Sequence, residues 1–199
     1  MYSNTLIETN SGVLFDLASP NIKYIFIDDI AYSLAKVVRF NGHLNCFYST
    51  ATHCCVLTDW VLAQSWGTHE KGLLMLLHHG IDAYISDIPF AVRNVVPEIK
   101  PLKESIEQAV AQRFNMVWPW PQWLLDANLS LILQEQKQFT CLSDEYIASV
   151  SSLEPFNLSI PEWNWQTAAQ EYLQRFNQLC PDAADFYSPN FQLSQFAAT

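Results

Sequence analysis

Histidine and aspartate side chains gather at the end of one apolar stretch of the chain, residues 73–89. His78 and His79 follow the apolar run directly, and Asp82 and Asp87 come next, before a proline ends the segment. On a helix, His78 and Asp82 would lie one turn apart on the same face, and His79 would be rotated by about 100° from His78. Adjacent imidazoles close to two carboxylates could bind a metal or transfer protons, which is more typical of a functional site than of a solvated turn.

A third histidine is predicted to face the interior from a helix earlier in the chain. Ser49 or Thr50 has the side chain of an N-cap residue and would begin this helix. His53 shares a face with Leu57, one turn further on, so we expect its imidazole to point inward.

A later helix, predicted from Gln122 to about Cys141, supplies one more inward-facing polar residue. One face of this helix carries Leu124, Asn128, Leu131 and Glu135. Asn128 therefore faces inward, whereas Asp126 lies on a mostly polar face. We expect this helix and the two that carry the histidines to converge on one pocket.

The composition is that of a chain that can bury one sizeable core. Half of the 199 residues are hydrophobic and 15% are charged, so we predict a single all-α domain over residues 1–199. Its core would span about residues 11–141, and a C-terminal helix with an irregular tail would follow over residues 142–199. A short β-ribbon of two strands, residues 13–15 and 24–27, is predicted before the helices.

Capping residues and prolines set the remaining segments. The expected segments are helices from Asp28 or Asp29 to about Asn41-Gly42, from Pro101 to Phe114 and from Trp163 to Leu179, an irregular connection over residues 89–97 and an irregular tail over residues 181–199.

The charge balance excludes a nucleic-acid polymer as the partner. Twenty acidic residues against ten basic ones give a formal net charge of −10, and Lys and Arg form no cluster. Five cysteines lack a paired spacing, so we predict reduced thiols in the cytoplasm. No apolar stretch is long enough to cross a membrane, and the first residues lack the features of a signal peptide.

A series of short motifs runs through the first part of the chain. They are NSG at residues 10–12, FD at 15–16, IDDIA at 27–31, RFNGH at 39–43, FYSTATH at 47–53 and DAYISDIP at 82–89. In this order they resemble the HD-domain superfamily of metal-dependent phosphohydrolases, in its bacterial and phage branch of small nucleotide phosphohydrolases. The resemblance covers roughly residues 11–139. It implies a helical bundle that holds one metal between helices, with a nucleotide phosphate beside it.

The resemblance also assigns metal-binding roles to residues of the predicted pocket. His53 and His78 match two metal-binding histidines, and His79 stands where the family has the aspartate of its name. Asn128 stands near the position of a last metal-binding aspartate. Three imidazoles and an amide leave the charge of a divalent ion uncompensated, so hard, oxygen-preferring ions should bind poorly. Zinc or a similar ion, such as cobalt, nickel or manganese, can still be held.

Catalytic and substrate-binding roles follow from the same resemblance. Asp82 stands where the family has a glutamate that orients or activates the attacking water, and Asp87 matches an acid beside the site. Both carboxylates could place negative charge near the metal without binding it directly. Arg39 matches a phosphate-binding arginine, and His43 in the same motif is a second substrate-binding candidate. Arg39 could instead be a helix-end charge, and His43 could merely fix a loop.

Two outcomes of these ligand changes stay open. The chain is either a phosphohydrolase that acts on a nucleotide or deoxynucleotide with an altered metal, or an inactive relative without the metal. The inactive relative would bind a nucleotide or a protein partner through the same cleft. An interaction module that self-associates through its acidic surface and aromatic tail is a further alternative. Related small HD proteins often form dimers, so we expect a homodimer.

Overall fold

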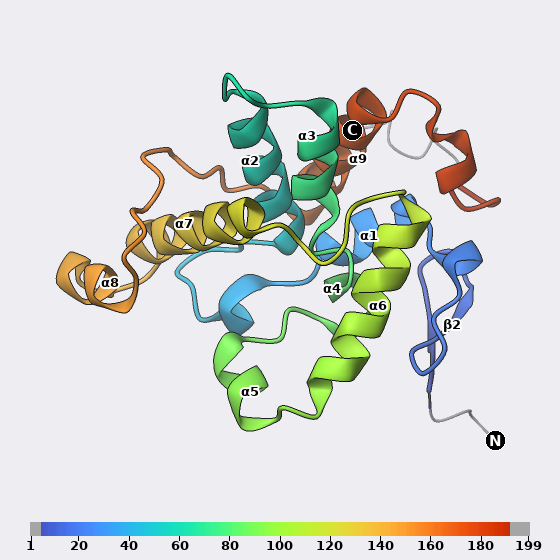
Figure 1. Cartoon of the computed structure of the whole chain (residues 1–199), viewed down its shortest axis with the longest axis horizontal. Helices are drawn as coiled ribbons and strands as arrows, with labels where there is room; N and C mark the ends of the chain where they lie inside the picture. Colours follow the sequence, from blue (N-terminus) through green and yellow to red (C-terminus); the bar gives the residue numbers. More distant parts are fainter. Residues whose placement is uncertain (1–4, 192–199) are drawn as a thin grey trace.

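Helices dominate the structure, and a short hairpin precedes them (Figure 1). The computed structural model describes residues 5–191. Its elements, in order, are β1 (Leu6–Glu8), β2 (Leu14–Asp16), α1 (Ile27–Leu34), α2 (Thr50–Leu62), α3 (His69–Leu77), α4 (Asp82–Ile85), α5 (Phe90–Val95), α6 (Ile99–Arg113), α7 (Gln122–Phe139), α8 (Asp144–Val150) and α9 (Trp165–Leu179), with 3-10 turns at Ile22–Tyr24, Arg39–Gly42 and Ala183–Phe186. This confirms the prediction of an all-α fold with a short N-terminal ribbon. Within the described range, no helix combines the length and the apolar character needed to cross a bilayer.

The hairpin pairs different strands from those predicted. Strand β2 covers most of the first predicted strand, but its antiparallel partner is β1. The turn between them contains Gly12, whose φ of 83° is readily adopted only by glycine. The prediction that residues 24–27 form the second strand is wrong. Asp28 and Asp29 place acidic groups in the first turn of α1 and so favour a helix that begins at Ile27.

Helix α1 is shorter than predicted. It ends at Leu34, and Val38 is already extended, with a φ of −79° and a ψ of 141°. Phe40 and Asn41 then adopt a φ of 53°, which an α-helix does not tolerate. The chain instead continues as an extended piece and a 3-10 turn. The backbone N–H of Arg39 donates to the carbonyl of Tyr48 at 3.0 Å, which brings Arg39 back alongside the start of α2.

Two clusters of buried apolar side chains hold the helices together. One lies between α1, α3, α6 and α9 and includes Ile30 and Leu76. The other lies between α2, α3 and α7 and includes Leu57 and Met75. Helix α3 contributes to both, and it runs beside α2 (Figure 1). The C-terminal end of α3 is therefore fixed between the two clusters.

Helix α3 ends one residue before the two adjacent histidines. His78 occupies its C-cap, and the chain turns tightly there, since the N–H of Gly80 donates to the carbonyl of Leu77 at 2.8 Å. A Cβ at residue 80 would lie 3.0 Å from that carbonyl oxygen and 3.0 Å from a methyl carbon of Val110, so glycine permits this close approach. Helix α4 then begins at Asp82. The prediction that His78 and Asp82 share one helical face is therefore wrong.

Two short helices were not predicted from the sequence. Helix α5 occupies most of the connection over residues 89–97, and none of its residues is buried. Helix α8 precedes α9, where no helix was predicted. Helices α6, α7 and α9 match their predicted ranges to within about two residues, which is the usual uncertainty of helix ends. The tail predicted over residues 181–199 contains a 3-10 turn, and its residues 192–199 lie outside the described range.

Two adjacent carboxylates at the start of α1 hold the two ends of the described chain. Asp29 accepts hydrogen bonds from the backbone N–H and the hydroxyl of Ser11, at 2.6 and 2.7 Å. Asp28 accepts the corresponding pair from Ser188, at 2.8 and 2.5 Å. Both acids lie at a helix N-terminus, where the helix dipole favours negative charge. The hairpin and the C-terminal segment are thus fastened to one turn of α1.

Replacing Asp28 by alanine should lower the free energy of unfolding by about 2–3 kcal/mol, because the change leaves two buried donors of Ser188 without an acceptor. Urea-unfolding curves measure the loss. The matched control is Asp126→Ala, since Asp126 is partly exposed on α7 and accepts a hydrogen bond from Gln122 of the same helix. We expect a change within about 0.5 kcal/mol for the control. Equal losses in the two variants would contradict the role of Asp28.

Candidate metal centre

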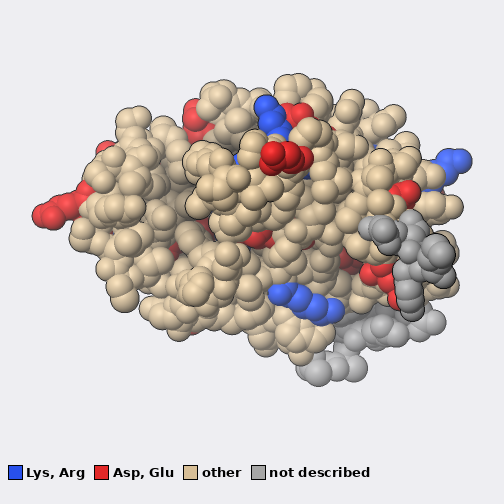
Figure 2. All heavy atoms as spheres, turned by 90° about the horizontal axis from the view of Figure 1, so that it is seen from below, with Lys and Arg blue, Asp and Glu red and all other residues tan. Residues whose placement is uncertain are grey.

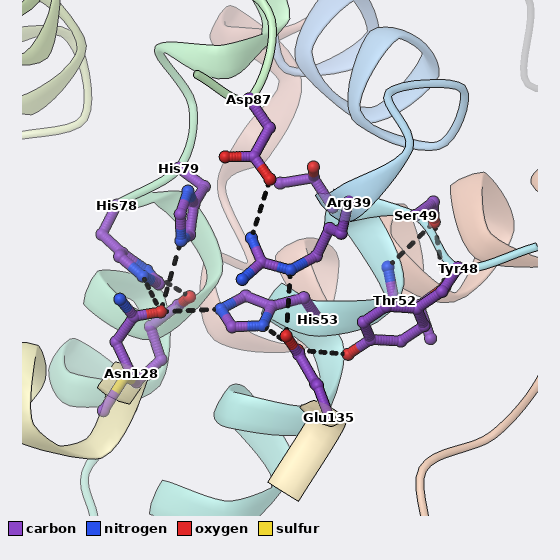
Figure 3. A network of polar contacts seen from close by, with 12 residues as sticks. Arg39, Tyr48, Ser49, Thr52, His53, His78, His79, Asp87, Asn128 and Glu135 are labelled. Atoms are coloured by element: carbon purple, nitrogen blue, oxygen red, sulfur yellow. Dashed lines mark hydrogen bonds and ion pairs between the residues drawn. The ribbon is translucent and has the colours of Figure 1, made fainter. Parts of the chain in front are cut away.

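Side chains from three helical segments converge on one point (Figure 3). His53 lies in α2, His78 and His79 follow the end of α3, and Asn128 lies in α7. One ring nitrogen from each histidine lies within 4.8 Å of those of the other two. The Oδ1 atom of Asn128 lies 2.8, 3.5 and 3.3 Å from the Nε2 atoms of His53, His78 and His79. The structure thus brings the four proposed ligands together.

The local sequence explains why His53 faces this point. Ser49 is the N-cap of α2, as predicted, and its Oγ atom accepts from the N–H of Thr52 at 3.2 Å. Capping fixes where the helix begins, and so it fixes which side chains face the interior. His53 and Leu57, one turn apart, are both fully buried.

Each of the three imidazoles has its Nδ1 atom next to an acceptor. The Nδ1 atom of His78 lies 2.9 Å from the carbonyl of Met75, that of His79 lies 2.7 Å from Oδ2 of Asp82, and that of His53 contacts Oε1 of Glu135. Carbonyl and ionised carboxylate oxygens can only accept, so each Nδ1 carries the hydrogen and donates it. We assign the Nδ1–H tautomer to all three rings from these partners.

The Nε2 atom is then an acceptor in all three histidines. Three lone pairs and Oδ1 of Asn128 face the same point, and acceptors this close repel one another unless a positive charge or a hydrogen-bond donor lies between them. Histidines that bind metals usually donate their other ring N–H to a carboxylate or a carbonyl, as these rings do. Around a tetrahedral zinc, two ring nitrogens lie about 3.4 Å apart. The three histidines could therefore hold a metal ion if their ring nitrogens moved about 1.5 Å closer together.

The three rings are held in the neutral form. Burial lowers the pKa of His53 well below its ordinary value, and the positive charge of Arg39 lowers it further. Burial also lowers the pKa of His78 and of His79, and in each case a neighbouring histidine adds to the effect. Neutral imidazole is the form that binds a metal, so no proton has to be displaced before binding.

Glu135 is the central acid behind the cluster, and the sequence reasoning gave it no role. This fully buried carboxylate accepts from the hydroxyl of Tyr48 at 2.7 Å and from Nε of Arg39 at 3.2 Å, in addition to its contact with His53. Burial raises the pKa of Glu135, whereas Arg39 and Tyr48 lower it. A signal for Glu135 was present, because it shares the inner face of α7 with Asn128, where a carboxylate needs partners.

Arg39 is a buried cation, with 4% of its surface exposed. Burial alone would lower its pKa, but Glu135 and Asp87 outweigh burial and raise the pKa above its ordinary value. Its Nη1 atom lies 3.3 Å from Oδ2 of Asp87. Asp87 therefore contacts the arginine, whereas Glu135 contacts His53, a proposed metal ligand. The Nη2 atom of Arg39 makes no hydrogen bond to any residue that the structure describes, so it is available to an anion.

Asp82 joins the cluster through His79. Its carboxylate is buried, and Oδ2 accepts from Nδ1 of His79. Burial raises the pKa of Asp82 to about 6, against the opposing positive charges of Lys103 and Arg39. The carboxylate is therefore mostly ionised at neutral pH. In the described part of the chain no hydrogen bond reaches its Oδ1 atom, which is left for another partner.

His43 is not part of this network. It is exposed at the end of the 3-10 turn Arg39–Gly42, where its backbone N–H donates to the carbonyl of Phe40 at 3.0 Å. Its imidazole makes no hydrogen bond within residues 5–191. The geometry therefore lends no support to the predicted role of His43 in substrate binding.

Comparison with known proteins identifies a similar protein, but it gives no information on activity. No family model matches the chain. The chain is 28% identical over 178 residues to the uncharacterized protein YfdR of Escherichia coli (strain K12), and the match covers 88% of this chain and 96% of the relative. The similarity thus spans nearly all of both chains. The resemblance to the HD superfamily stays a prediction.

Proposed function

We propose that this chain is a metal-dependent phosphohydrolase of the HD type, which removes phosphate from a nucleotide or deoxynucleotide. His53, His78 and His79 would hold zinc or a similar divalent ion, with Asn128 as a fourth ligand. Such an ion, when bound, lowers the pKa of a water molecule and stabilises the negative charge of the reacting phosphate. The observation that carries the proposal is the convergence of three Nε2 lone pairs from rings that are each oriented by an acceptor on the far side.

The other buried polar residues would position substrate and water. Arg39 would donate from Nη2 to a phosphate oxygen, because its Nε and Nη1 atoms are already engaged. Asp82 would accept a hydrogen from the attacking water through Oδ1, while Oδ2 keeps His79 oriented. Glu135 would hold His53 in place and supply negative charge near the ion.

The proposed substrate is a small nucleotide and not a nucleic-acid polymer. The formal net charge is −10, and on the face drawn in Figure 2 the Lys and Arg side chains are few and lie apart from one another. A polymer needs many cations along its phosphates, whereas a single phosphate needs one or two.

Metal analysis combined with a turnover panel tests the proposal. The purified chain would be loaded with zinc, cobalt, manganese or nickel in turn, and phosphate release would be followed with ribonucleotides and deoxyribonucleotides. We expect stoichiometric binding of at least one metal and phosphate release from at least one nucleotide. An outcome with no bound ion and no release under any of the four metals would refute the proposal.

A second candidate is a relative that binds a nucleotide without cleaving it. Asn128 favours it, because rotation of the amide by half a turn would direct its two N–H donors at the cluster, which satisfies two of the three lone pairs without an ion. In that case the double variant His79→Asp with Asn128→Asp, which restores the carboxylates of the HD motif, should gain metal binding that the native chain lacks. Strong metal binding by the native chain would rule this candidate out.

The single variant Asn128→Asp should bind divalent metals about ten-fold or more tightly than the native chain, because a full negative charge replaces an amide at the ligand position. Manganese should gain more than zinc, since it prefers oxygen ligands. Isothermal titration calorimetry with each metal measures both gains. Asn128→Leu, which keeps the size but removes the oxygen, is the control and should bind more weakly than the native chain. Unchanged affinity in both variants would show that Asn128 does not face the ion.

A further inference from the structure

A cavity of ≈ 400 Å³ lies between α5, α6 and the start of α7. Its walls include Phe90 and Arg93 from α5, Lys103 from α6, and Trp120 and Leu125 from the third side. Pockets of about 300–1,000 Å³ are typical of small-molecule sites. The cavity is therefore large enough for a nucleoside.

Two aromatic side chains give this cavity flat apolar surface. Phe90 is 70% exposed even though it is large and apolar, so its ring is available for stacking. Trp120 packs against the apolar cluster between α2, α3 and α7, which fixes its position. Both rings line the cavity, so their apolar surfaces can contact a planar base.

Three basic and two acidic side chains line the cavity, namely Arg93, Lys100, Lys103, Glu104 and Glu107. Lys100 is paired with Glu104 at 3.7 Å, and Lys103 is paired with Glu107 at 2.6 Å. Arg93 pairs with no carboxylate in the described part of the chain and instead lies over the ring of Phe90, 5.5 Å from its centroid. Arg93 is thus the cation of this wall that is available to a ligand anion.

Residues that line the cavity lie near acidic residues of the candidate metal centre. Phe90 follows Asp87 by three positions, so their Cα atoms are at most about 11 Å apart. Lys103 and Arg93 are also close enough to Asp82 for their charges to act on its carboxylate. A ligand with its phosphate at the histidines therefore has its other end within reach of the cavity.

We propose that this cavity binds the base and sugar of a nucleoside monophosphate whose phosphate lies at the histidine cluster. The base would stack on Phe90 beside the apolar wall of Trp120 and Leu125, and the positive charge of Arg93 would attract the phosphate. This inference rests on the proposed function, since it places the nucleoside end of the same substrate.

Equilibrium binding to the zinc-loaded chain tests this inference. The two probes are phosphonate analogues of 2′-deoxyadenosine 5′-monophosphate and of 2-deoxyribose 5-phosphate, in which carbon replaces the ester oxygen and prevents hydrolysis. Calorimetry should show the base-bearing probe bound about ten-fold or more tightly than the sugar probe, which is the gain that base stacking provides.

Two variants with matched controls locate the base. Leu125→Trp should fill the cavity, and Leu129→Trp is its control, one turn along the same helix with similar exposure, 38% against 42%. Phe90→Ala should remove the stacking surface, and Val95→Ala is its control on the same short helix, at a residue that is 78% exposed. We expect the preference for the base-bearing probe to fall about five-fold or more in Leu125→Trp and Phe90→Ala. Both controls should keep it, and affinity for the sugar probe should be the same in all four.

The outcomes separate this inference from the proposed function. If the native chain binds both probes equally well, or if Leu125→Trp and Phe90→Ala keep the native preference, the base lies elsewhere and only the cavity assignment is overturned. If the zinc-loaded native chain binds neither probe, the proposed function fails, and the cavity assignment fails with it.

Discussion

Zinc should raise the melting temperature of the native chain by about 5–10 °C, and the variant His78→Ala should lose this increase. A ligand at 100 times its dissociation constant stabilises the folded state by about 2.7 kcal/mol, and each 1 kcal/mol corresponds to about 2–4 °C for a chain of this size. Loss of His78 should weaken zinc binding more than about 100-fold, because the loss of a group that merely orients a ligand already costs about 10–100-fold. Differential scanning calorimetry with and without zinc measures the effect.

The control for this experiment is His43→Ala, which removes an exposed histidine outside the cluster. It should keep the full zinc-dependent increase. Zinc also binds cysteines in unfolded chains and so reduces the increase, but both variants retain the five cysteines of the native chain. An equal zinc effect in His78→Ala and His43→Ala, or no effect in the native chain, would contradict a metal centre at the three histidines.

Replacing Glu135 by leucine should destabilise the chain by about 3–5 kcal/mol, which is the usual cost of removing one partner from a buried ion pair. The variant leaves Arg39 buried, with only the partly exposed Asp87 to balance its charge. It also leaves the hydroxyl of Tyr48 and Nδ1 of His53 without their acceptor. Urea unfolding at constant pH measures the loss of stability.

The variant Glu135→Gln distinguishes the effect of Glu135 on stability from its effect on metal affinity. The amide keeps the shape and one acceptor oxygen, so its loss of stability should be smaller than that of the leucine variant. Its metal affinity should nevertheless fall about 10–100-fold, because the group that orients His53 is weakened. Asp87→Asn, on the other side of Arg39, serves as the control and should leave metal affinity nearly unchanged. If Glu135→Gln binds metal as tightly as the native chain does, the carboxylate has no part in orienting His53.

The ligand cluster could be predicted from the sequence because the pattern of apolar residues along each helix shows which side faces the interior. A capping serine and a buried leucine one turn away oriented His53, and helical spacing alone turned Asn128 inward. The adjacent histidines His78 and His79 indicated a functional site because both imidazoles lie close in the sequence to two carboxylates. None of these inferences needed a contact between distant residues.

The parts that were missed depend on tertiary contacts or on the backbone. The pairing of Asp82 with His79 follows from the break at Gly80, where a Cβ would lie only 3.0 Å from Val110, a residue distant in the sequence. Glu135 shared the correct face with Asn128, but its three donors come from other segments of the chain, which no local pattern reveals. The strand partner of β2 was wrong because an apolar tetrapeptide fits a strand and the start of a buried helix equally well.

The two carboxylates at the start of α1 also constrain how the chain folds during its synthesis. Asp28 and Ser188 lie 160 positions apart, so a growing polypeptide makes this contact long after Asp28 has been synthesised. Until Ser188 has left the ribosome, the carboxylate of Asp28 lacks these two donors. The nascent chain can therefore form its early helices in order, but the native packing around α1 is completed only after Ser188 has emerged.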